Sequence, residues 1–221
     1  MQPPARPTGP LDRPTIRVVG IAGPSGAGKT TLARALADRA GGAVFALDAY
    51  YHDQREISEA AIQVDVPEAI DAALAVSQLR TLVTGVAVEQ PVYDFATHAR
   101  LESTRLIQPA RLLLVEGLFA FFWEDLRAAM HTRVFVDLDH DECLRRRIAR
   151  DLRERGRTRD EVIAQYEQNV RPMYERHVAP TRSYAHLVLD GQADIEVMAA
   201  RVLGAIEPPA TGAQKTNDSA R

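Results

Sequence analysis

Short apolar runs alternate with longer stretches of helical periodicity along most of the chain. The apolar runs are rich in Val, Ile and Leu, as is typical of strands buried on both faces of a sheet. They span residues 15–20, 43–47, 111–115, 133–137 and 186–189. Helices are predicted between them, at residues 29–40, 67–84, 124–130, 141–155, 159–177 and 193–206. This alternation predicts an α/β fold, in which a five-stranded parallel sheet forms the middle of a three-layer sandwich.

One segment, residues 86–108, breaks the alternation. Its two apolar ends could pair as antiparallel strands, with residues 91–100 lying between them, so a small β-hairpin insertion is expected. The whole of residues 15–206 then forms one domain, consistent with 221 residues of which 46% are hydrophobic. The proline-rich residues 1–14 and the polar residues 207–221 are expected to be a disordered leader and a disordered tail.

Charge and composition argue against some classes of binding partner and cellular location. The net charge of −3 gives no overall attraction to nucleic acid or to an anionic membrane. The single cysteine, Cys143, excludes an internal disulfide and fits a reducing cytoplasm. The sequence has no apolar run near the ~20 residues that a transmembrane helix needs, and residues 1–14 have no apolar stretch typical of a secretion signal. We therefore expect a cytoplasmic protein with neither a membrane nor a nucleic acid as partner.

The first predicted strand leads into a glycine-rich segment that opens the first predicted helix. It reads G-x-x-x-x-G-K-T, which in this strand–loop–helix context predicts a P-loop rather than an ordinary glycine-rich turn. Backbone N–H groups and the helix N-terminus would cradle phosphates, Lys29 would reach the outer phosphates, and the Thr30 hydroxyl would bind Mg²⁺. The predicted nucleotide-binding residues are Gly23, Pro24, Ser25, Gly26, Ala27, Gly28, Lys29, Thr30 and Thr31.

Two carboxylates follow predicted strands and should lie at the same edge of the sheet as the P-loop, because ligands of open α/β sheets bind at the carboxyl ends of the strands. Glu116, at the end of the third strand, could hold Mg²⁺. Asp48, just after the second strand, could accept a proton from a substrate hydroxyl or share in binding Mg²⁺. The alternatives are a solvated Glu at a strand end and an Asp that forms a turn.

Eight arginines are concentrated within residues 145–159. They could form a solvated helix face paired with Asp151 and Glu154, a nucleic-acid-binding surface, or a lid that closes over phosphates. The acidic net charge and the lack of interleaved aromatic residues argue against nucleic acid. With a P-loop present, we favour a lid over about residues 145–160, in which three or four of the arginines contact the phosphates.

The hairpin segment carries Tyr93, Phe95 and His98. Such a cluster could stack on a planar base and hydrogen-bond to it. Alternatively, its aromatic residues could simply pack the hairpin against the domain.

From about residue 16 to residue 202, these motifs together resemble the uridine kinase and phosphoribulokinase family of P-loop kinases, and most closely its uridine–cytidine kinases. The P-loop alone is common to many families. More specific are P-V-Y-D-F-A-T-H-A-R at residues 91–100 and R-R-I-A-R-D followed by E-R-G-R at residues 146–157. The resemblance implies transfer of the γ-phosphoryl group of ATP or GTP to the 5′-hydroxyl of uridine or cytidine, with Mg²⁺, in an enzyme that is often a homotetramer.

The resemblance also implies roles for individual residues. Asp48 would be the base for the ribose 5′-hydroxyl, and Thr30 and Glu116 would serve Mg²⁺. Phosphoryl transfer would further depend on Lys29, Arg150 and Arg155. The residues implied to contact the nucleoside are Tyr51, Asp65, Tyr93, Phe95, His98, Arg147, Arg157 and Gln165.

One departure concerns the stretch before the helix predicted at residue 67. The family usually has an aromatic residue and a His on either side of an Asp, whereas this chain has Val64, Asp65 and Val66. A different nucleoside, a sugar phosphate or a pantothenate-like alcohol therefore stays open as the acceptor. A GTP-binding switch is disfavoured because neither asparagine, Asn169 or Asn217, is followed by the Lys of an N-K-x-D motif.

Overall fold

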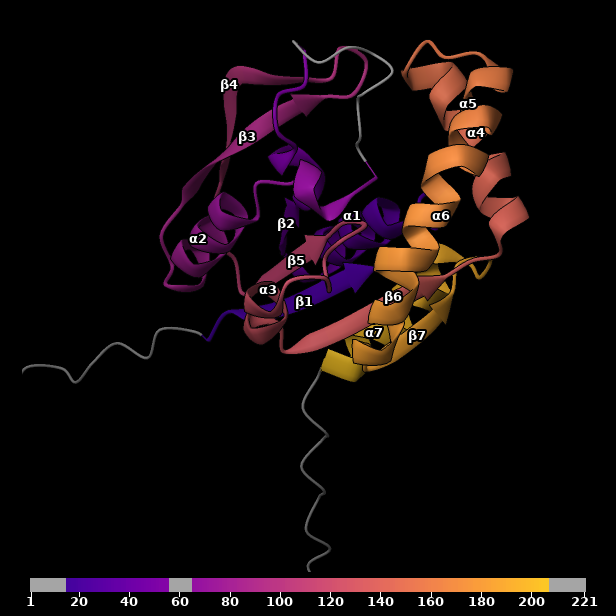
Figure 1. Cartoon of the computed structure of the whole chain (residues 1–221). Coiled ribbons are helices and arrows are strands. Elements are labelled where there is room, and N and C mark those ends of the chain that lie inside the picture. Colours follow the sequence, from indigo (N-terminus) through magenta and orange to yellow (C-terminus); the bar gives the residue numbers. More distant parts are fainter. Residues whose placement is uncertain (1–14, 56–64, 207–221) are drawn as a thin grey trace, which may run out of the picture.

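The computed structural model describes residues 15–55 and 65–206 of the chain (Figure 1). A parallel five-stranded sheet forms its centre, in the order β2-β5-β1-β6-β7. The strands are β1 (Arg17–Ala22), β2 (Ala43–Ala46), β5 (Leu112–Glu116), β6 (Thr132–Asp137) and β7 (Leu187–Asp190). The chain runs from β1 outward to β2 on one side and from β5 to β6 on the other. The two connections diverge between the adjacent strands β1 and β5, and open α/β sheets bind ligands at such a point.

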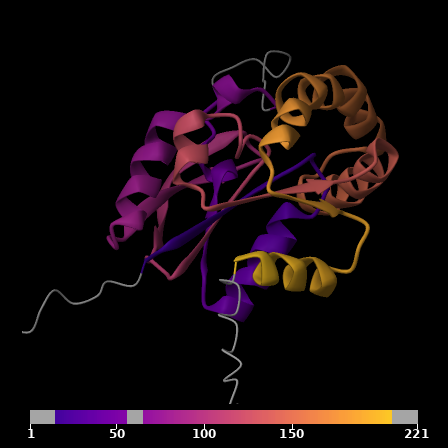
Figure 2. The same ribbon diagram turned by 90° about the horizontal axis from the view of Figure 1, so that it is seen from below.

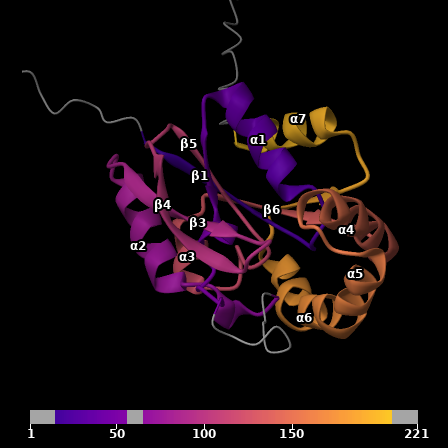
Figure 3. The same ribbon diagram turned by 90° about the horizontal axis from the view of Figure 1, so that it is seen from above.

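Helices cover both faces of the sheet, which gives the three layers that the sequence predicts (Figure 3). On one face, α1 (Lys29–Ala40) and α7 (Ile195–Ile206) contribute Leu32, Leu36 and Val202 to one hydrophobic core. On the other face, α2 (Ala72–Val83) and α3 (Glu124–Ala129) contribute to a second core that includes Leu79 and Leu126. All five residues of β5 are buried, as expected of a central strand between two cores. Figure 2 shows the same layers from the opposite side.

The insertion is a two-stranded antiparallel hairpin of β3 (Val88–Asp94) and β4 (Ala99–Ile107). It stands beside the sheet in Figure 1 and approaches its carboxyl edge with its tip. The Gln90 side chain ties the hairpin to the sheet by donating to the carbonyl of Ala46 at 3.2 Å. Residues 91–100, which the sequence places between two short strands, belong mostly to these strands, with only the turn at residues 95–98 outside them.

Five of the eight clustered arginines lie on α4 (His140–Glu154), and Arg155, Arg157 and Arg159 follow it. A second helical segment comes next and forms an arm beside α4 (Figures 1 and 3). That arm comprises α5 (Arg159–Gln165), α6 (Arg171–Met173) and two π-helical turns, Tyr166–Val170 and Tyr174–Val178. Its first half packs through Tyr166 and Val170 into the core beneath α1, and its second half packs through Val178 into the opposite core. Thr158 and Glu161 form a capping box that starts α5.

Several boundaries differ from the sequence prediction. Asp48 does not follow its strand directly but lies in a 3₁₀ turn, Leu47–Tyr50. The helix expected from residue 67 is split, because a 3₁₀ turn at Pro67–Ala69 precedes α2, whose N-cap is Asp71. Extended backbone at Ile70, which bridges to Tyr51, separates the two segments. The predicted leader and tail lie outside the described residues, and within the described part of the chain no helix is long and apolar enough to cross a membrane.

Candidate active site

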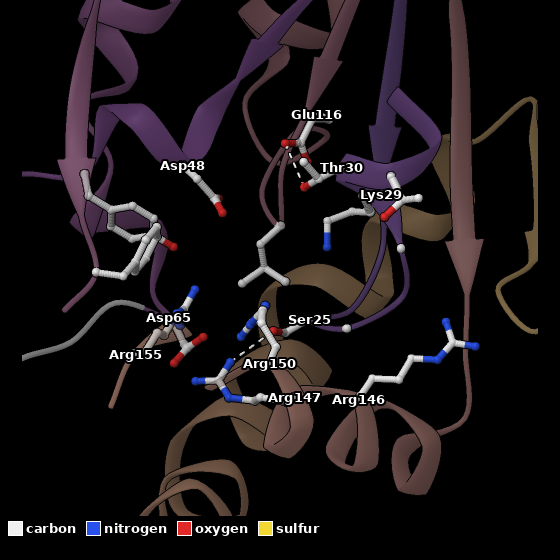
Figure 4. A pocket seen from close by; sticks show the side chains of 16 residues that line it. Ser25, Lys29, Thr30, Asp48, Asp65, Glu116, Arg146, Arg147, Arg150 and Arg155 are labelled. Carbon is white, nitrogen blue, oxygen red and sulfur yellow. Dashed lines mark hydrogen bonds between the residues drawn. The ribbon is translucent and has the colours of Figure 1, made fainter. Parts of the chain in front are cut away.

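A cavity of about 330 Å³ opens at the carboxyl edge of the sheet, between the P-loop, the hairpin and α4 (Figure 4). Residues from all three elements line it, together with the 3₁₀ turn after β2 and the end of β5. The lining includes five cationic side chains, Lys29, Arg146, Arg147, Arg150 and Arg155, and three acidic ones, Asp48, Asp65 and Glu116. The excess of positive charge suits a ligand that carries several phosphates.

The P-loop lies at the N-terminus of α1, and its glycines fit it closely to neighbouring backbone. Gly23 has a φ of 144°, and a Cβ atom at this position would lie 2.2 Å from the carbonyl oxygen of Val136. Gly26 has a φ of 89°, and a Cβ there would lie 2.9 Å from the carbonyl oxygen of Cys143. The loop is therefore wedged between β6 and α4, which fixes the anion-binding backbone against the arginine-bearing helix.

Lys29 is buried, and its Nζ atom donates to the carbonyl oxygen of Pro24 at 2.8 Å. Burial lowers the pKa of Lys29, while the nearby carboxylates of Glu116 and Asp48 oppose this effect. In this position the ammonium spans the mouth of the P-loop, where a phosphate group would replace Pro24 as its partner.

Thr30, Glu116 and Asp48 form an all-oxygen cluster on the floor of the cavity. The Thr30 hydroxyl donates to Glu116 Oε1 at 3.0 Å. Burial raises the pKa of Glu116 to about 7, and the charge of Asp48 adds to this effect, whereas Lys29 opposes it. No cluster of three or more His, Cys, Asp or Glu side chains able to hold a metal occurs among the described residues. The donors fit Mg²⁺, which commonly takes one or two carboxylates and completes its shell with water and substrate phosphates.

Across the cavity from the P-loop lies an aromatic cluster made of Tyr51, Tyr93 and Phe95. The ring centroids of its three pairs are 4.9 to 5.3 Å apart. Tyr51 and Phe95 line the cavity, and Tyr93 packs behind them. The cluster packs the hairpin against the domain, as one of the two interpretations of the sequence predicts, and two of its rings face the cavity. Stacking of a base on these rings stays a prediction.

Asp65 is the third carboxylate of the cavity and is only 8% exposed. Burial raises its pKa, and the charges of Arg147, Arg155 and Arg157 oppose the rise. Val66, which follows it, is half-buried and packs against the core with α2. Val64 lies outside the described residues.

A chain of polar contacts joins the P-loop to the hairpin. Arg147 donates from Nη1 to Ser25 Oγ and from Nη2 to Gln165 Oε1, each at 3.0 Å. Gln165 Oε1 also accepts from Arg157, whose Nη2 lies 3.3 Å from Nε2 of His98. His98 has a φ of 53° at the hairpin turn, a left-handed conformation that costs a non-glycine residue energy and is often found at functional sites.

Four of the eight clustered arginines line the cavity. Arg155 lies over the ring of Phe95, with 4.3 Å between its Cζ atom and the ring centroid, a cation–π contact. Burial lowers the pKa of Arg155 to about 10, and the adjacent charge of Arg150 contributes. Arg146 points away from the other three (Figure 4) and donates to the carbonyl oxygen of Gly191 and to Glu142.

The structure thus gathers most, but not all, of the sequence-predicted site residues around one cavity. Four predicted nucleoside residues lie behind its wall and reach it through neighbours: Tyr93, His98, Arg157 and Gln165. Three of the nine predicted P-loop residues, Gly23, Pro24 and Ala27, shape the loop without lining the cavity. Leu118 also lines the cavity, although no sequence motif marks it as a site residue. It lies there because it follows Glu116 by two residues at the end of β5.

Comparison with known proteins agrees with this geometry. The Phosphoribulokinase / Uridine kinase family model matches residues 18–197. A protein of Deinococcus deserti named uridine kinase is 42% identical over 178 residues, which cover 78% of this chain and 86% of that protein. One of Chloroflexus aggregans with the same name is 39% identical over 200 residues, or 86% of this chain and 96% of that protein.

A solved structure described as a possible uridine kinase from Bacillus stearothermophilus has the same fold. Its TM-score is 0.52 at 19% sequence identity, over 81% of this chain and 91% of that one. At this level of identity the similarity concerns the fold alone. The family model covers most of the chain and the sequence relatives exceed one third identity over most of its length, and so this protein belongs to the phosphoribulokinase and uridine kinase family.

Proposed function

We propose that the protein transfers the γ-phosphoryl group of ATP or GTP to the 5′-hydroxyl of uridine or cytidine. The observation that carries the proposal is the cavity in which the P-loop, with Lys29 and Thr30, faces Asp48 and the aromatic cluster. Donor and acceptor would therefore meet in one space bounded by α4. The names of the relatives, uridine kinase in both species, support the choice of acceptor.

In this mechanism the P-loop backbone and Lys29 bind the donor phosphates, and the arginines of α4 neutralise charge on the group in transfer. Thr30 and Glu116 would hold Mg²⁺, which supplies further charge neutralisation at the phosphates. Asp48 is half-buried and lines the same cavity, where its carboxylate would orient the acceptor hydroxyl and accept its proton. Most of the rate enhancement would come from positioning and electrostatics rather than from proton transfer.

The acceptor side uses the residues that line or back the hairpin wall. Tyr51 and Phe95 offer aromatic surface for a pyrimidine, and Asp65 offers a carboxylate for ribose hydroxyls. His98 and Arg157, which contact each other at the turn of the hairpin, would contribute polar groups for the base edge. A cytoplasmic location and a homotetrameric assembly are part of the same proposal and rest on the single cysteine and on the resemblance to the family.

A panel of acceptors tests the proposal. Purified protein is incubated with Mg²⁺ and either ATP or GTP, and product formation is measured for uridine, cytidine, purine nucleosides, pantothenate and sugar phosphates. We expect UMP or CMP as the main product. Transfer to a different alcohol, with none to uridine or cytidine, would refute the proposed acceptor but not the kinase activity. If no acceptor is phosphorylated, phosphoryl transfer itself is refuted.

A further inference from the structure

Asp151 does not line the cavity, yet three of the arginines that do so surround it. Its side chain is completely buried. Arg150 Nε donates to Asp151 Oδ1 at 2.8 Å, Arg155 Nε lies 3.6 Å from the same oxygen, and Arg147 Nε lies 3.5 Å from Oδ2. One carboxylate is thus shared by three guanidinium groups.

Burial of a carboxylate is costly unless cations and hydrogen bonds compensate it. Burial alone would raise the pKa of Asp151, but the Arg150 hydrogen bond and the charges of Arg150, Arg147 and Arg155 outweigh it, so the pKa is lowered. Conversely, three guanidinium groups this close would repel one another without a shared anion. Asp151 and the arginines therefore hold each other in place.

The three arginines extend from Asp151 to three different parts of the site. Arg147 reaches the P-loop through Ser25. Arg155 lies over Phe95 on the acceptor side. Arg150 lines the cavity, and its buried Nη2 atom has no hydrogen-bond partner among the described residues, which leaves a donor available for a phosphate oxygen.

We propose that Asp151 is a positioning residue for phosphoryl transfer, which fixes the directions of Arg147, Arg150 and Arg155 so that the donor side and the acceptor side of the cavity are aligned with each other. The proposal rests on the proposed kinase activity, but Asp151 itself touches neither substrate. It acts through the arginines, and its contribution lies in where it holds them rather than in the charge it adds.

The variant Asp151→Asn separates these two roles, because they predict opposite results. If Asp151 only offset positive charge, its removal would leave the arginines in place with one more net positive charge, and a triphosphate would bind as tightly or more tightly with an unchanged kcat. If it positions the arginines, their misplacement should lower kcat by about 10- to 100-fold. The dissociation constant of ATP, measured by calorimetry without acceptor, should change by less than about threefold, since the P-loop is intact.

Glu154→Gln is the matched control, because Glu154 lies on the same helix and pairs with the exposed Arg153. It makes the same carboxylate-to-amide change and should leave kcat within twofold of the parent. A kcat for Asp151→Asn equal to that of the control would overturn the proposal. An equal loss of kcat in both variants would also overturn it, since the loss would not be specific to Asp151.

A double mutant tests whether Asp151 acts through an arginine. Arg150→Met alone should lower kcat, and Asp151→Asn added to it should lower kcat by less than about threefold more. Independent, multiplicative losses would contradict the proposal.

Asp151→Glu gives a second test should the Asn variant fail to fold, as judged by its melting temperature. It keeps the charge and moves the carboxylate by about one methylene group, so positioning predicts a lower kcat, whereas charge compensation predicts a normal one. Both tests use whichever acceptor the panel identifies. A wild-type protein without any transfer activity would refute the proposed function itself. If the wild-type protein is active and Asp151→Asn has the same kcat, only the proposed role of Asp151 is refuted.

Discussion

The buried, ionised carboxylate of Glu116 should lower the free energy of unfolding of the nucleotide-free protein. The substitution Glu116→Gln should measure by how much. Glu116 is 2% exposed, and burial together with the charge of Asp48 raises the pKa of its carboxyl group from 4.5 to about 7. Glutamine has nearly the same shape, cannot ionise, and keeps an oxygen that can accept from Thr30. The substitution therefore removes the charge and little else.

The sign and size of the effect follow from this pKa. Below about pH 4.5 the group is protonated in both the folded and the unfolded chain, so its burial does not lower the free energy of unfolding through ionisation. As the pH rises toward 7, the unfolded chain gives up the proton while the folded chain keeps it, so stability is progressively lost, and above the folded pKa the loss is complete. The rise from 4.5 to about 7 corresponds to about 3 kcal/mol, at about 1.4 kcal/mol per pKa unit.

Urea unfolding measures the difference, in a chelating buffer without nucleotide. At pH 8 we expect Glu116→Gln to be about 3 kcal/mol more stable than the parent protein, or about 6 to 12 °C higher in melting temperature for a domain of this size. At pH 5 the difference should be below about 1 kcal/mol. Phosphoryl transfer should fall by at least about tenfold, because a proposed Mg²⁺ ligand is lost.

The exposed Glu102 of β4 gives a matched control, in which Glu102→Gln should change stability by less than about 0.5 kcal/mol at either pH. Two results would refute the reasoning. The first is a Glu116→Gln variant that is no more stable than the parent at pH 8. The second is a gain of the same size at pH 5 and pH 8, which would show that packing rather than ionisation is responsible.

Three further predictions concern Asp48, the P-loop and the start of α5. Asp48→Asn should lower kcat by about 10²- to 10⁴-fold with a near-normal dissociation constant for ATP, as measured by steady-state kinetics and calorimetry; a kcat within threefold of the parent would exclude Asp48 as the base. Gly23→Ala should abolish ATP binding or prevent folding, because its Cβ would lie 2.2 Å from the Val136 carbonyl oxygen, and normal binding would contradict the tight fit of the loop. Thr158→Ala should destabilise α5 by about 1 kcal/mol, because it removes the capping box with Glu161. Amide hydrogen exchange in α5 should become faster, and an unchanged exchange rate would contradict the prediction.

The order of strands and helices, the P-loop and the hairpin were accessible from sequence because each depends on local pattern. A short apolar run rich in β-branched residues, such as that of β1, allows few structures, and the P-loop motif fixes the geometry of its own turn. The split before α2 was not accessible, because Pro67 and the acidic residues after it are typical of a helix start. Only a tertiary contact, the bridge between Ile70 and Tyr51, holds the backbone extended at that point.

At the site, the sequence indicated which types of residue would meet but not which contacts they would make. The arginine cluster was evident from the sequence. The sequence did not show that Arg147, Arg150 and Arg155 would surround Asp151, whereas Arg146 turns toward Gly191. This difference depends on which face of α4 each arginine occupies and on how β7 packs beside the helix. In the sequence, Asp151 appeared as a pairing partner in a charged helix and as the last residue of the R-R-I-A-R-D motif, without a role of its own. Its side chain is completely buried, which the run of charged residues around it in the sequence does not predict.

The π-helical turns give the arm after α4 an unusual sensitivity to chain length. Each such turn holds one residue more than an α-helical turn would, and together they let one arm bury Tyr166 and Val170 on one side of the sheet and Val178 on the other. Deletion of one residue within residues 166–170 would restore an α-helix and rotate the remainder of the arm by about 100° relative to Gln165. This part of the chain should therefore accept exchanges of side chains far more readily than insertions or deletions, and its length should be nearly fixed among proteins that build the same site.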